Sequence, residues 1–356
     1  MRLMDLPILV QRKIIPRLEM VDVIELTMMS SKFHRNLRNV KIPIEKFQIF
    51  ITTGTMCIII NKAIQFRLNV FETPKHPIIR KFNRKTVEIK EKERDSTTFL
   101  INSPSFEEAD RQNLLESVYR HLVTFLQLPW QKFPKLIFNR RVSLQNLGIL
   151  ENSRFSKISI CQNDGQSSVV LSPEDIEFIL EKVKVQKLIM NVIAENAENP
   201  NFLYQHFDIP DQNPVEIKEQ LTILDPSWVD FSWFWPSMNT ESLILSMGKF
   251  SEGECLKKLN GILRQWRIER NEHLVKLRFT TKGNMGEWRN EVFEETSAVA
   301  TRFRNTEIST HFPDIQSHYA MDIQSARNKR LITVILAGSE ILMIVWNEKN
   351  LKTIGK

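Results

Sequence analysis

The sequence predicts a mixed fold, α+β with α/β character. Three short N-terminal helices precede a β-meander region and a longer series of repeated strand–helix units that ends in antiparallel strands. Three observations lead to this prediction: helical apolar periodicity up to about residue 39, period-two alternation after Pro43, and a short Leu- and Ile-rich motif that recurs further along. We expect three parts, residues 1–42, 43–128 and 129–356.

Three helices are expected before residue 40. The first covers about 8–15 and stops at Pro16, because proline lacks the N–H that a helix interior needs. The second covers about 21–29, and the third begins at Ser30-Ser31, since serine is a favourable N-cap. A segment of fewer than about 40 residues seldom encloses a core of its own. These apolar helices must therefore pack on the rest of the chain or on a partner.

Strands are expected from about residue 45. The segment EKFQIFITTGTMCIIIN (45–61) has the alternation of a hairpin around Gly54, and IQFRLNVF (64–71) and KTVEIKEKE (85–93) continue the period of two. A helix with one apolar face is expected from 105 to 127.

The recurring motif has apolar residues at its second and fourth positions, as in a half-buried strand. Helical stretches at 172–184 and 250–270 fall between copies, the first with Ser172 as cap and proline at its first position. Stacked right-handed βα units of this kind resemble a degenerate leucine-rich-repeat solenoid, and an α/β domain with leucine-rich strands is the open alternative. The copies are KLIFN, KISIC, KLIMN, QLTIL, SLILS and KLRFT, which begin at Lys135, Lys157, Lys187, Gln220, Ser242 and Lys276.

The C-terminal part predicts three antiparallel strands, HYAMDIQS, RLITVIL and ILMIVW, with turns at 327–329 and 337–339. The longest apolar region, 331–346, is interrupted by Gly338-Ser339-Glu340, so we do not expect it to span a membrane. The cysteines Cys57, Cys161 and Cys255 are far apart and lack C-x-x-C spacing, which suits a reducing compartment. We expect an intracellular protein, cytoplasmic or nuclear or both, without a membrane partner.

The formal net charge of +7 raises the question of a nucleic-acid partner. Even the densest basic run, 78–95, interleaves seven basic with four acidic residues, as at a hairpin edge protected by Lys and Arg. Nucleic acid is therefore not expected as a partner, and a basic nucleic-acid-binding scaffold remains an alternative. The aromatic segment SWVDFSWFWP (227–236) has no alternating basic residues, so we expect core packing rather than base stacking.

No catalytic motif is present. The sequence has no G-x-x-x-x-G-K-[ST], G-x-G-x-x-G, G-x-S-x-G or H-E-x-x-H. His311 and His318 are seven residues apart, but Pro313 interrupts any helix between them, so we expect surface histidines. We predict no enzymatic activity, no cofactor and no metal site.

The N-terminal segment resembles an F-box. The family pattern is LP, then Ile and Leu positions, an acidic residue before a hydrophobic run, and finally Val-Ser-Lys-aromatic. Here Phe33 replaces the commoner tryptophan. The residues that carry the match are, in order, Leu6, Pro7, Ile14, Ile15, Leu18, Asp22, Val23, Ile24, Leu26, Ser30, Ser31, Lys32, Phe33, His34, Arg35 and Leu37.

The C-terminal part resembles the F-box associated domain of nematode-type F-box proteins. The similar segments are MNTESLILS (238–246), LKKLNGILRQWRIERNEHLVKLRF (256–279) and HYAMDIQSARNKRLITVIL (318–336) with the final ILMIVW. Thr240 stands where that family usually has cysteine.

The resemblance implies a substrate-recruiting subunit of an SCF-type cullin–RING ubiquitin ligase. Such a subunit binds a Skp-family adaptor, and through it a cullin, and holds an unidentified target protein. A non-degradative F-box scaffold, and a helical cap on the chain's own β region, remain alternatives. Outward positions on a concave strand face are the candidate target contacts, including Asn139, Asn191 and Arg278. The residues expected to contact the adaptor are Leu6, Pro7, Ile8, Ile14, Ile15, Leu18, Ser30, Lys32 and Phe33.

Overall fold

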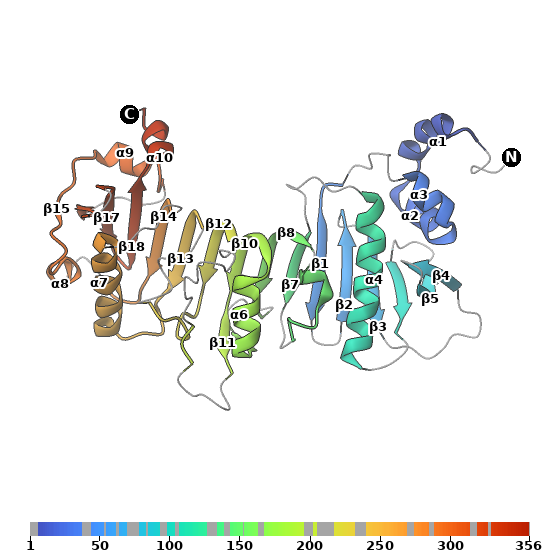
Figure 1. Cartoon of the computed structure of the whole chain (residues 1–356), viewed down its shortest axis with the longest axis horizontal. Coiled ribbons are helices and arrows are strands. Elements are labelled where there is room, and N and C mark those ends of the chain that lie inside the picture. Colours follow the sequence, from blue (N-terminus) through green and yellow to red (C-terminus); the bar gives the residue numbers. More distant parts are fainter. Residues whose placement is uncertain are drawn as a thin grey trace. The chain divides into compact units, whose positions relative to one another are not determined.

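A computed structural model divides the chain into two compact units, residues 1–159 and 160–356. Each unit combines a β-sheet with helices, so the expected α+β content is confirmed (Figure 1). The predicted segments 1–42 and 43–128 lie in the first unit, and the third extends over both. The structure describes residues 6–37, 44–52, 55–61, 64–69, 78–82, 85–92, 98–103, 107–126, 134–138, 143–151, 153–162, 167–195, 202–204, 217–231, 240–268, 274–284, 288–313, 319–326 and 329–355.

The N-terminal segment is helical, as expected. Ser30 caps the last helix: its Oγ accepts a hydrogen bond from the backbone N–H of Phe33 at 3.2 Å. Pro16 does not simply end the first helix, because the chain continues into a 3₁₀ turn in which proline occupies an early position and needs no N–H partner. The elements are α1 (Ile8–Ile14), the 3₁₀ helix η2 (Ile15–Arg17), α2 (Met20–Met29) and α3 (Ser31–Leu37).

The sheet of the first unit has the order β8-β7-β1-β2-β3-β6-β5-β4. Two antiparallel meanders, β1–β3 and β4–β6, meet through parallel pairing of β3 with β6, and β7 pairs in parallel with β1. β4 lies at the edge, so the basic run does form an edge hairpin, whereas β6 was not predicted. The strands are β1 (Phe47–Thr52), β2 (Thr55–Ile60), β3 (Ile64–Asn69), β4 (Ile78–Phe82), β5 (Lys85–Lys92), β6 (Thr98–Asn102), β7 (Lys135–Phe138) and β8 (Arg154–Ile160).

The helix α4 (Glu108–Leu126) packs on this sheet against β2, β3 and β4. Its buried residues Leu115, Val118 and Leu122 form the apolar face expected from the helical periodicity. The same helix also contacts α3, so it connects the N-terminal helices to the sheet.

In the second unit, four parallel strands lie side by side in the order of the sequence: β10 (Lys184–Met190), β12 (Ile217–Ile223), β13 (Ser242–Ser246) and β14 (Lys276–Thr280). The helix α6 (Pro173–Glu181) precedes β10, and α7 (Glu252–Ile268) joins β13 to β14 (Figure 1). Ser172 caps α6 as expected: its Oγ accepts from the Asp175 N–H at 3.2 Å.

A helix in most of the gaps between strands was expected, and the described residues correct this. They contain no helix between β10 and β12 or between β12 and β13, and only the four-residue α5 (Gly148–Glu151) between β7 and β8. A small parallel pair, β9 (Val169–Leu171) with β11 (Val192–Ala194), was not predicted.

The C-terminal strands are antiparallel, as expected. β18 (Glu340–Trp346) pairs with β14 and with β17 (Leu331–Ala337), which in turn pairs with β16 (Tyr319–Gln324). Gly338 adopts φ +59° in the β17–β18 turn, a conformation that glycine takes without steric cost. The two-residue strand β15 (Val299–Ala300) pairs with β16 at the edge.

The second and fourth positions of the repeated motif are buried in every copy. In the second unit the pairing registers align them across the sheet. The first row contains Leu188, Leu221, Leu243, Leu277, Met343 and Val334, and the second contains Met190, Ile223, Leu245, Phe279, Ile341 and Leu336.

The expectation of a surface position was wrong for His311, of which only 6% is exposed. The helix α9 (Asn305–Ser309) brings Phe303 and Phe312 onto β17 and β18, and His311 lies with its ring 5.4 Å from that of Trp346. His318 lies outside the described residues. The burial follows from the long-range packing of α9, which the spacing of the two histidines does not reveal.

We predict that Leu243→Ala lowers the free energy of unfolding of the second unit by about 2–5 kcal/mol, because it leaves a cavity in the middle of an aligned row. The control is Ile244→Ala on the opposite side of the same strand, where the side chain is only partly buried and the loss is expected to be smaller. Urea unfolding monitored by tryptophan fluorescence measures both. Equal losses would contradict the assignment of the rows as the core.

Candidate functional site

The N-terminal helices divide their apolar residues between the interior and the surface. Ile15 and Phe33 are buried within the chain, together with most of the inward face of α2. Leu9 and Met29 are instead 68% and 65% exposed, and Val10 is also exposed. One side of the segment therefore belongs to the core of the first unit, while several large apolar side chains remain in contact with solvent.

The residues expected to contact an adaptor fall into four groups. Pro7 is exposed, whereas Ile15 and Phe33 are covered by the chain's own side chains. Ile8 and Lys32 belong to α1 and α3, but their side chains are outside the described part of the structure. The partly buried members of the predicted set are Leu6, Ile14, Leu18 and Ser30.

Sequence reasoning did not select Leu9, Val10 or Met29. The signal was present, because 8–10 is an unbroken apolar run in a helix, and one helix turn cannot point three successive residues at the same core. Met29 likewise follows directly after Met28, which is buried.

His121 of α4 connects α2 and α3 to the rest of the first unit. Its Nε2 lies 3.0 Å from Thr27 Oγ1 of α2, and its backbone carbonyl lies 3.2 Å from His34 Nε2 of α3. The two imidazole rings stack with centroids 4.4 Å apart, and Phe82 of β4 meets the His121 ring edge-on at 5.3 Å. Side chains from α2, α3 and β4 thus converge on a single residue.

Burial of His121, and secondarily the proximity of His34, lower its pKa from the usual 6.5 to about 3. The ring is therefore neutral at physiological pH. Protonation would place a charge in a largely desolvated position.

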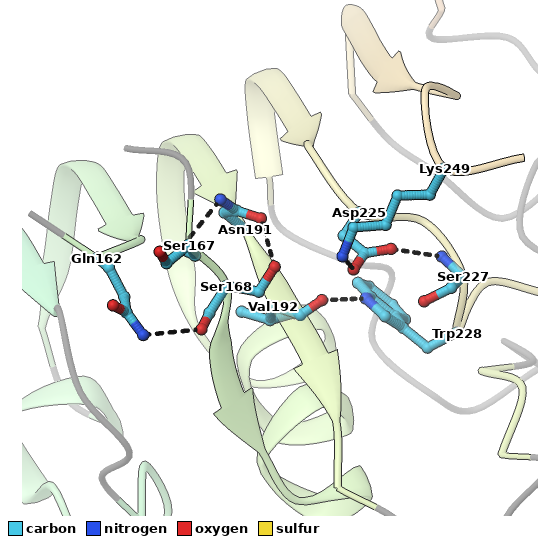
Figure 2. Close-up of polar contacts among 9 residues, drawn as sticks. All are labelled: Gln162, Ser167, Ser168, Asn191, Val192, Asp225, Ser227, Trp228 and Lys249. Atoms are coloured by element: carbon cyan, nitrogen blue, oxygen red, sulfur yellow. Dashed lines mark hydrogen bonds and ion pairs between the residues drawn. The ribbon is translucent and has the colours of Figure 1, made fainter. Parts of the chain in front are cut away.

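In the second unit, polar residues follow the carboxyl ends of parallel strands, and Figure 2 shows how they are bonded. Asn191, directly after β10, is buried: its Oδ1 accepts from Ser168 Oγ at 2.9 Å, and its Nδ2 donates to the Ser167 carbonyl at 3.2 Å. Its amide therefore joins its own loop to the loop before β9, and both of its polar atoms are used within the chain.

A second polar group follows β12. The carboxylate of Asp225 is buried and pairs with Lys249 Nζ at 2.5 Å, while its other oxygen accepts from the Ser227 N–H at 3.3 Å (Figure 2). Lys249 itself is half exposed. This pair links the loop after β12 to the loop after β13.

The two remaining candidate target contacts are Arg278 and Asn139. Arg278 is partly buried and forms a bidentate pair with Glu340 of β18, with Nη2 at 2.6 and 2.8 Å from the two carboxylate oxygens. That contact ties the last parallel strand to the antiparallel part. Asn139 lies outside the described residues, and the structure does not bring Asn191 and Arg278 into one cluster.

The aromatic segment supplies core, as expected, where it is described. Trp228 and Phe231 are buried, and the Trp228 indole Nε1 donates to the Val192 carbonyl at 3.1 Å (Figure 2). The rest of the segment, 232–236, lies outside the described residues.

The described parts of the chain lack two other kinds of feature. They contain no group of three or more His, Cys, Asp or Glu residues placed to hold a metal ion. They also contain no helix that is both long enough and apolar enough to cross a membrane. Comparison of the chain with models of known families, with curated proteins and with solved structures found no match in any of the three.

We predict that the packing around α4 weakens as the pH falls below the unfolded-state pKa of His121, near 6.5. Below that pH the unfolded chain binds a proton at His121, whereas the folded chain, in which the pKa is lowered, does not. The free energy of unfolding therefore falls as the pH falls. Between about pH 7 and pH 5.5 the loss is about 1 kcal/mol. Hydrogen exchange of the α4 amides, corrected for intrinsic exchange rates, measures this loss of stability. In His121→Gln this component should disappear, and an unchanged pH dependence would contradict a neutral imidazole.

Proposed function

We propose that this chain is a substrate-recruiting subunit of an SCF-type cullin–RING ubiquitin ligase, in which the N-terminal helices bind a Skp-family adaptor. The supporting observation is the division within those helices. The segment that resembles an F-box is anchored by one apolar side, yet leaves Leu9, Val10 and Met29 exposed. Exposed large apolar side chains on a soluble surface favour an interaction site when several occur together in one short segment.

The chemistry of the exposed residues suits a helical partner. Leu9 and Val10 belong to α1, and Pro7 precedes it. Apolar residues presented by short helices pack into grooves of a partner helix bundle, and each square ångström of apolar surface removed from water contributes about 25 cal/mol. The adaptor-contact set is therefore proposed to include Leu9 and Val10 beside Leu6, Pro7, Ile14 and Leu18.

The buried side of these helices is equally important for a receptor function. Thr27 and His34 contact His121, and Phe33 is fully buried, so α2 and α3 are packed firmly on α4. An adaptor bound to this segment would be held in a fixed orientation relative to the first unit. A ligase subunit acts through such geometry, because a held target lysine has a raised effective concentration near the ubiquitin-charged enzyme.

The second unit is the proposed target-binding part. Its parallel strands follow one another in sequence order, which supports a leucine-rich-repeat-like arrangement related to the F-box associated domain. Asn191 and Arg278 already use their polar groups within the chain, so we do not assign the target contact to them. The chain itself is proposed to be non-catalytic and to need no cofactor.

The test is binding of the purified chain to a purified Skp-family adaptor. Leu9→Glu/Val10→Glu should weaken binding at least about tenfold, because it places two charges in an apolar contact. Both positions are exposed, so the variant should keep the circular dichroism of the wild type. Val299→Glu, at an apolar residue of the second unit that is 61% exposed, is the control and should bind normally.

Two outcomes would contradict the proposal. A folded wild-type chain that does not bind the adaptor would leave the helices as a cap on their own unit. Equal binding by the double variant would place any contact elsewhere. If the adaptor does bind, accumulation of co-purified proteins upon proteasome inhibition would distinguish a degradative receptor from a non-degradative scaffold.

A further inference from the structure

A pocket of about 230 Å³ lies in the second unit between α7 and the segment that follows β12. Val229 and Phe231 contribute buried apolar surface to it, and Leu203 stands at its side with 47% of its surface exposed. Pockets for drug-sized ligands and cofactors are about 300–1,000 Å³. The smaller volume here suits one bulky side chain of a bound peptide.

The wall opposite α7 is held by backbone and side-chain bonds. Tyr204 forms an isolated parallel bridge with Val229: its N–H donates to the Trp228 carbonyl at 2.7 Å, and its carbonyl accepts from the Asp230 N–H at 3.1 Å. The rings of Tyr204 and Trp228 also pack edge to face, with their centroids 6.4 Å apart. The pocket wall is thus built on two fully buried aromatic residues and is pre-formed.

The α7 wall is open because of a glycine. Gly261 lines the pocket, and a Cβ placed there would meet no atom within 4 Å. Glycine is unfavourable in the middle of a helix, yet here it leaves free volume where any other residue would project a side chain. Gly253 lies in the same helix, also with open space around its Cβ position, but does not line the pocket.

The rim of the pocket is basic on the helix side. The Lys258 ammonium lies 4.6 Å from the ring centroid of Phe231 and 4.7 Å from that of Phe250, a cation–π arrangement that fixes its position. Lys257 is exposed and, among the described residues, forms no ion pair. Asp230 is the one acidic residue among those that line the pocket, so the two lysines leave a positive balance.

We propose that this pocket receives a peptide segment of the target protein in which a bulky apolar side chain is flanked by acidic residues. The apolar side chain fills the space beside Gly261, and the flanking carboxylates pair with Lys257 and Lys258. The assignment of the peptide to a ligase target rests on the proposed function. The binding itself does not, because it requires no adaptor.

The experiment measures fluorescence anisotropy of a labelled pentapeptide, a central phenylalanine with glutamates on both sides, against the purified full-length chain. The wild type should bind it. Gly261→Leu should weaken binding at least about tenfold, since the new side chain occupies the space of the anchor. Gly253→Leu is the matched control and should bind as the wild type does. Leucine is a better helix former than glycine, so neither variant is expected to fold poorly.

Charge is tested separately. Lys257→Glu should weaken binding of the acidic peptide, and binding by the wild type should fall with added salt because an exposed ion pair is screened. The same peptide with lysine flanks or with a central alanine should bind at least about tenfold more weakly. Absence of wild-type binding, equal binding by Gly261→Leu, or equal binding of the lysine-flanked peptide would overturn the proposal. Peptide binding without adaptor binding would instead reject only the ligase function.

Discussion

The alignment of apolar side chains across paired strands is the constraint on which the rest of the structure depends. Leu188, Leu221, Leu243 and Leu277 occupy equivalent positions on four parallel strands, and the row continues into the antiparallel strands at Met343. A shift of one residue in any pair would turn its apolar side chains to the opposite face. The first unit obeys the same rule, with Ile49 opposite Leu136 and Ile58 opposite Phe66.

Because the register is fixed, the loops at the ends of the strands are also fixed. Asn191 and Asp225 follow adjacent strands, and the side chain of each bonds to a neighbouring loop. Trp228, bonded to the Val192 carbonyl, anchors the segment that forms one wall of the pocket beside α7. A polar residue directly after a strand, in a position typical of binding sites, can therefore hold neighbouring loops together instead. The pocket is formed by other residues nearby.

The N-terminal helices combine buried apolar side chains with exposed ones. Ile15 and Phe33 stabilise the first unit, and the His121 ring joins α2 to α4 at the cost of sensitivity to protonation. Leu9 and Met29 contribute little to that packing because they face solvent. Anchoring and exposure within one short segment are the two properties that a rigidly held docking element requires.

The sequence by itself determined the local elements. Alternation identified the six motif strands, Ser30 and Ser172 marked helix starts, and Gly338 marked a turn, because each depends on neighbours a few residues away. Only the tertiary structure decided that His311 is buried and that β3 pairs in parallel with β6. Burial and strand partners depend on segments far apart in the chain, and no local period carries that information.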